Sequence, residues 1–115
     1  MKRFGVVLLA AFALLAARSA AQKDASFSGE IMDSQCALLG GHVKMQKQGE
    51  NAKDCTIRCV GMGGKYALFN ADTKMRYQLD DQKQAEKFAG EKVTVTGTYD
   101  AASKTIHVTK IKAAS

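Results

Sequence analysis

The sequence predicts a mainly β protein in which five short strands close into a small barrel. Two observations support this. Five segments alternate apolar and polar residues, as half-buried strands do. Their order is three strands, one short helical segment and two more strands, which is the element order of a five-stranded OB-like barrel. A long irregular segment, about residues 34–64, separates the first two strands and contains all three cysteines.

The first 21 residues have the three-part pattern of a signal peptide. Lys2 and Arg3 precede an apolar run over residues 4–17, and the small residues 19–21 follow. This run is shorter than the roughly 20 residues that span a bilayer, so cleavage is favoured over a membrane anchor. We therefore expect a periplasmic or secreted protein in which residues 22–115 form a single OB-like domain.

Net charge and hydropathy restrict the classes of partner. Three of the 17 basic residues lie in the predicted signal peptide, which leaves 14 basic against 11 acidic residues, spread along the chain. Nucleic-acid-binding domains gather basic residues into a stripe or cluster with stacking aromatics, and this chain has no such concentration. No later segment is apolar enough over a sufficient length to span a membrane. We expect an envelope or extracellular partner, with no nucleic acid and no membrane span after cleavage.

The first three strands follow from alternation and turn residues. A strand is predicted over residues 27–32, a second over 65–70 and a third over 75–79. The last two are expected to form a hairpin, because the turn residues 70–72 separate them.

The helix and the last two strands follow from capping and alternation. Asp81 and Gln84 have the spacing of a capping box, and strands are predicted over residues 93–99 and 106–109. Gly97 predicts a bulge that lets the sheet curl. Eight side chains are predicted to share one core: Ile31, Tyr77, Leu79, Phe88, Val93, Val95, Ile106 and Val108.

The cysteines lie in a segment that would form the mouth of the barrel, where OB folds commonly bind ligands. Asp54 is expected to cap a short helical piece over residues 55–59. In such a helix Cys55 and Cys59, four residues apart, would share one face. With Cys36 and His42 they form the chain's one constellation of metal-ligand side chains.

The first interpretation of this constellation is a metal site. Thiolates and imidazole suit zinc or copper, and the nearby Met32, Met45 and Met62 would favour Cu(I) because thioethers are soft ligands.

Two other interpretations remain open. Oxidising compartments favour a disulfide, here Cys36 with Cys55 or Cys59, which would leave an odd thiol. A thiol-redox protein would use Cys55 or Cys59, since a thiol at a helix start can have a lowered pKa. The missing C-x-x-C motif counts against redox activity. Convergence of the three cysteines is expected under both the metal and the disulfide interpretation, because pairing of the first two strands would draw both ends of the insertion together.

Three segments resemble a known family: Gly29 to Ala37, Cys55 to Val60, and Val93 to Thr98. They are similar to a family of short secreted bacterial proteins with a domain of unknown function. The resemblance implies export and a barrel, and it carries no established activity.

Together these features favour an exported, non-enzymatic binding module whose Cys/His loop holds a soft metal or a small partner surface. No set of nucleophile, base and orienting residue is evident in the sequence. The alternatives are a disulfide-stapled structural or protein-interaction domain and a thiol-redox protein.

The signal-peptide pattern makes a prediction about the mature protein. The exported chain should begin near Gln22, because the small residues before it suit signal peptidase. The intact mass of the exported protein measures this start. Recovery of the full-length chain from the membrane fraction would contradict the prediction.

Overall fold

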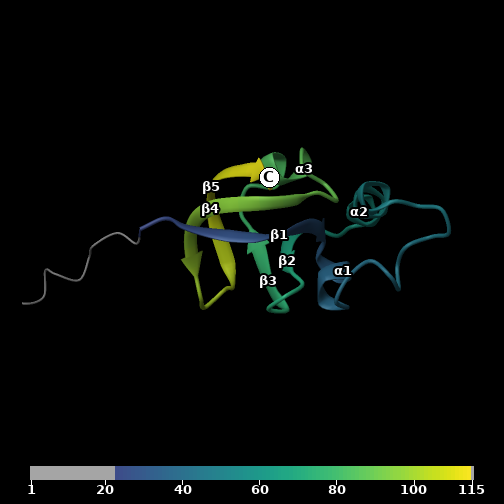
Figure 1. Cartoon of the computed structure of the whole chain (residues 1–115), viewed down its shortest axis with the longest axis horizontal. Coiled ribbons are helices and arrows are strands. Elements are labelled where there is room, and N and C mark those ends of the chain that lie inside the picture. Colours follow the sequence, from purple (N-terminus) through teal and green to yellow (C-terminus); the bar gives the residue numbers. More distant parts are fainter. Residues whose placement is uncertain (1–22, 115) are drawn as a thin grey trace, which may run out of the picture.

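The computed structural model describes residues 23–114, so the predicted signal peptide lies outside the described residues. This part of the chain contains five strands and three helices (Figure 1). The strands are β1 (Ala25–Asp33), β2 (Tyr66–Asn70), β3 (Met75–Leu79), β4 (Lys92–Asp100) and β5 (Thr105–Ala113), and the helices are α1 (Ser34–Leu38), α2 (Ala52–Gly61) and α3 (Gln82–Glu86).

The strands form one sheet that closes in a ring in the order β1-β2-β3-β5-β4. Neighbours are antiparallel except β3 and β5, which are parallel. β1 closes the ring because its first half pairs with β4 and its last residues pair with β2. The predicted mainly β class, the five strands and the helix between the third and fourth strands are confirmed.

The inward faces of the strands form the main hydrophobic core. Ile31, Leu68, Val95 and Ile106 are fully buried there. All eight residues predicted to share the core belong to this cluster, with Tyr77, Phe88 and Val108 at its margin. At one margin the rings of Phe27, Tyr77 and Tyr99 contact one another with centroids 5.2 to 5.9 Å apart, a spacing that favours tilted aromatic pairs.

Gly97 marks the predicted irregularity in β4. The register of β4 with β5 shifts between Thr96 and Gly97. A Cβ atom at residue 97 would overlap the carbonyl oxygen of His107, so this position requires glycine. The irregularity therefore occurs opposite Gly97 as predicted, but the extra residue, Thr109, lies on β5 and not on β4.

Helix α3 is fastened to the sheet by side chains of its first turn. Asp81 caps the helix by accepting a hydrogen bond from the Gln84 backbone N–H (3.0 Å). The Gln84 side chain does not complete a capping box. Its Nε2 lies 3.2 Å from Asp81 Oδ2, and its Oε1 accepts from the Ile111 N–H on β5. Gln82 bonds both the N–H and the carbonyl of Tyr66 on β2.

The insertion is more ordered than its sequence suggests. Helix α1 was not predicted, because five residues are too few to show helical periodicity. Helix α2 spans ten residues, and its N-cap is Asn51, which accepts a hydrogen bond from the Asp54 N–H (2.8 Å). The prediction that Asp54 is the cap is therefore wrong.

Figure 1 shows α1 and α2 together at the end of the sheet opposite the β4–β5 turn. Both helices pack against β1, and α1 also contacts β2. Within residues 23–114 no helix has the length and apolar character needed to cross a membrane.

The core assignment makes a stability prediction. Val95→Ala should lower the free energy of unfolding by roughly 1–3 kcal/mol, because it removes fully buried methyl groups from a small core. Urea unfolding measures the change. The matched control is Val43→Ala, at a valine that is 89% exposed, where we expect less than about 0.5 kcal/mol. Equal effects of the two substitutions would contradict the assignment.

Candidate functional site

The three cysteines meet in a second, smaller core between the insertion helices and the sheet. Cys36 comes from α1, and Cys55 and Cys59 lie one turn apart on α2. Cys36 and Cys55 are fully buried, and Cys59 is 4% exposed. The same cluster contains the buried Met32, Ala37, Ala67 and Phe69, with Met45 packed against it.

The junction of β1 with β2 brings these helices together. The last register pair of these strands is Asp33 with Tyr66. One residue further on, the Ser34 N–H donates to the Lys65 carbonyl (2.8 Å), so the insertion begins and ends at one place. Asp33 Oδ2 then accepts from the N–H groups of Gln35 and Cys36 and starts α1. The convergence expected from the positions of the cysteines follows from this junction.

His42 lies in the loop after α1 and faces the cysteines. Its Nε2 is 2.6 Å from Glu30 Oε2 on β1. Its Nδ1 is buried and has no hydrogen-bond partner among the described residues. Ligand atoms of Cys36, His42 and Cys55 lie within 4.8 Å of one another. Because Glu30 engages Nε2, Nδ1 is the ring nitrogen that is free to accept a ligand.

Asp33 adds a carboxylate on the other side of Cys36. Ligand atoms of Asp33, Cys36 and Cys59 lie within 4.8 Å of one another. Asp33 is 1% exposed, and its Oδ1 has no hydrogen-bond partner among residues 23–114. A Cβ atom at residue 64 would overlap this oxygen, so Gly64 leaves it room. Asp33 therefore caps α1 with Oδ2 and leaves Oδ1 free.

The surroundings of Cys36 and Cys55 disfavour ionisation of these two thiols. Burial, followed by the neighbouring Cys55, Cys59 and Asp33, raises the pKa of Cys36 to about 12. Burial also raises the pKa of Cys55, followed by the influence of Cys59 and Glu50. A thiol-redox role would require a lowered pKa at Cys55. That prediction is wrong, because the pKa of Cys55 is raised.

All three cysteines are free. The disulfide between Cys36 and Cys55 or Cys59, one of the sequence-based interpretations, is not formed. The reason is geometric: no two of the three sulfurs lie at the distance of a disulfide bond. Cys36 lies between the other two, because its ligand atom is within 4.8 Å of that of Cys55 in the group with His42 and of that of Cys59 in the group with Asp33.

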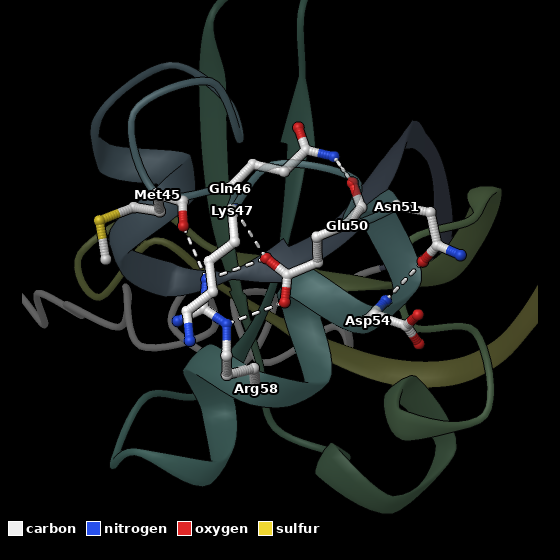
Figure 2. A network of polar contacts seen from close by, with 7 residues as sticks. All are labelled: Met45, Gln46, Lys47, Glu50, Asn51, Asp54 and Arg58. Atoms are coloured by element: carbon white, nitrogen blue, oxygen red, sulfur yellow. Dashed lines mark hydrogen bonds and ion pairs between the residues drawn. The ribbon is translucent and has the colours of Figure 1, made fainter.

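An ion pair fastens the loop that contains His42 to the helix that contributes two cysteines (Figure 2). Arg58 on α2 donates from Nε to Glu50 Oε2 (2.8 Å) and from Nη2 to Glu50 Oε1 (3.0 Å). The same Nη2 donates to the Met45 carbonyl (2.7 Å), and Glu50 also accepts from the Lys47 N–H (2.9 Å). The roles of Arg58, Glu50 and Glu30 were not predicted, because nothing in the sequence around them indicates these contacts.

Two cavities flank the cysteine cluster. One, of about 370 Å³, is lined by Glu30 and His42 together with Met32 and Phe69. The other, of about 300 Å³, lies on the side of Cys59 and is lined also by Asp33, Met45 and Met62. His107, the second histidine, is remote from both and pairs with Asp80 on the surface (3.1 Å).

A family model matches part of the chain. The model of a family described as "Protein of unknown function (DUF5818)" matches residues 59–114, from the end of α2 through β5. Neither a curated protein nor a solved structure matches the chain. The matched segment contains Cys59 but not Cys36, His42 or Cys55, so three of the four candidate ligands lie outside it.

The ion pair makes a prediction about pH. Hydrogen bonds from Arg58 hold the pKa of Glu50 at about 2, below its ordinary value of 4.5. A lowered folded-state pKa contributes stability above the ordinary value, and this stability is lost as the pH falls toward about 2. Glu50→Gln should therefore destabilise the protein near neutral pH, and its difference from the native protein should shrink in acid.

Urea unfolding of both proteins across this pH range provides the measurement. Glu91→Gln removes the same charge from an exposed glutamate and is the matched control. A pH-independent difference for Glu50→Gln would show that the ion pair does not act as described.

Proposed function

We propose that the protein is an exported, non-enzymatic binding module that holds one soft metal ion, Cu(I) or Zn(II). The ligands are the sulfurs of Cys36, Cys55 and Cys59 and the Nδ1 atom of His42. Three thiolates and one imidazole are a common ligand set for a tetrahedral ion. The scaffold is an OB-like barrel, which the strand order of the ring and the insertion between β1 and β2 support.

The observation that carries the proposal is the state of His42. Its Nδ1 is buried without a partner, and leaving such an atom unpaired costs about 1–3 kcal/mol. A bound cation would remove that cost. Histidines that bind metals almost always donate their other ring N–H to a carboxylate or carbonyl, and Glu30 accepts from Nε2 in this way.

The thiols support the same conclusion. Two of the buried thiols do not readily form thiolates, because burial raises the pKa of Cys36 and Cys55. A coordinated metal reverses this, since it deprotonates the thiol that binds it. The proposed site would therefore exchange protons for a cation.

The other interpretations have less support. A redox protein needs an accessible thiolate, whereas Cys36 and Cys55 are fully buried with raised pKa values. A stapled structural domain needs a disulfide, and the three cysteines are free. The periplasmic or secreted location and an envelope or extracellular partner that delivers or receives the ion are part of the proposal, based on the signal-peptide pattern of the first 21 residues.

The proposal is tested by metal titration of the reduced protein. We expect one equivalent of Zn(II) or Cu(I), and Co(II) in place of zinc should give thiolate charge-transfer bands. His42→Ala should weaken binding strongly, and Glu30→Gln should weaken it by roughly 10- to 100-fold through loss of the carboxylate behind the histidine. His107→Ala removes the exposed histidine and should leave the affinity unchanged.

If the native protein, with three titratable thiols, binds neither metal, the proposal is wrong. It is also wrong if His42→Ala and His107→Ala bind equally well, because the site would then lie elsewhere.

A further inference from the structure

The cavity beside Cys59 connects the thiols with the surface. It measures about 300 Å³, and of the three cysteines Cys59 lines it. Cys59 is also the one thiol with measurable exposure, 4%, whereas Cys36 and Cys55 have none. An ion that reaches the site from this side would meet the Cys59 sulfur first.

Asp33 provides a negative charge at the inner end of this cavity. Its side chain is almost completely buried, its Oδ1 has no hydrogen-bond partner among residues 23–114, and it lines the cavity. The carboxylate lies within 4.8 Å of ligand atoms of Cys36 and Cys59. A cation in the cavity would be attracted by this charge and passed directly to sulfur.

Two thioethers line the same cavity. Met45 packs against the cysteine cluster, and its carbonyl is held by Arg58, which fixes this part of the loop. Met62 follows α2 and is 66% exposed, so burial does not account for an apolar side chain at this position. Thioether sulfur is a soft ligand that suits Cu(I), while Zn(II) is bound by thiolate, imidazole and carboxylate.

We infer that this cavity is an uptake route for Cu(I), in which Met62 and Met45 act as transient ligands before the ion reaches Cys59. The inference rests on the proposed function and adds the identity of the metal and the side from which it arrives. Copper remains Cu(I) throughout. Its bonds to a donor molecule are replaced by bonds to thioether and then thiolate sulfur, and the displaced thiol protons leave to solvent.

The inference is tested by the rate of metal uptake. Cu(I) is presented anaerobically as its bicinchoninate complex, and its transfer to the native protein, Met62→Leu and Met45→Leu/Met62→Leu is followed by stopped flow. Leucine keeps the apolar volume and removes the sulfur. We expect the double variant to take up Cu(I) roughly tenfold more slowly, which corresponds to about 1.4 kcal/mol in the barrier, with unchanged equilibrium affinity.

Two controls distinguish the loss of the thioether sulfur from a general disturbance of the protein structure. Met75→Leu alters a partly exposed methionine on β3, outside the cavity, and should transfer Cu(I) at the native rate. Uptake of Zn(II) from a chromophoric chelator should be equally fast in every variant, because zinc gains little from thioethers. Met62→Leu changes an exposed side chain and keeps the test valid if the double variant misfolds.

Unchanged Cu(I) rates in Met62→Leu and the double variant would overturn the inference while the metal site itself stands. Equal slowing of Cu(I) and Zn(II) would also overturn it, because the methionines would then act through shape alone. Failure of the native protein to bind either metal at equilibrium would instead remove the proposed function, and the uptake route with it.

Discussion

The pairing of the last residues of β1 with β2 is the constraint on which the candidate site depends. Asp33 lies opposite Tyr66, and the next residues, Ser34 and Lys65, are joined by a backbone hydrogen bond. A long insertion therefore starts and ends at one point on the ring. Cys36 lies just after this point and Cys59 shortly before it. The pairing of β1 with β2 therefore also brings the cysteines together.

The fold was largely predictable from the sequence, because alternation and turn residues are local signals. For example, a glycine within an alternating strand, Gly97, predicted the irregularity that the register of β4 with β5 shows at this position. The structure of the insertion was harder to predict from the sequence. The cap of α2 is Asn51 and not Asp54, and both residues suit a cap by type, so the choice depends on where the helix can pack. α1 is too short to show a period, and it forms because Asp33 and the β1–β2 junction hold its first turn.

The candidate ligands could be named from the sequence, whereas the residues that position them could not. Thiol and imidazole chemistry identified Cys36, His42, Cys55 and Cys59 without any knowledge of the fold. The groups that orient them act over distance: Glu30 reaches His42 from another strand, and Arg58 fastens the loop by a side chain that no motif marks. Such contacts depend on tertiary placement, which residue type and spacing do not encode.

The two cores of the protein differ in how they are stabilised. The ring core is built of aliphatic and aromatic side chains, whereas the insertion core consists of three cysteines and a few small or flexible apolar residues, so it buries less apolar surface. Polar anchors supplement it: the Asp33 cap, the Asn51 cap and the ion pair of Arg58 with Glu50.

Within residues 23–114 three buried side-chain polar atoms nevertheless remain unpaired, Asp33 Oδ1, His42 Nδ1 and Thr56 Oγ1. The first two belong to residues grouped with the thiols. Proteins tend to tolerate such local violations at functional sites, where a ligand can offset them. A cation bound among these groups would therefore stabilise the insertion selectively, because binding to the folded state adds to its stability while the ring already has a complete core.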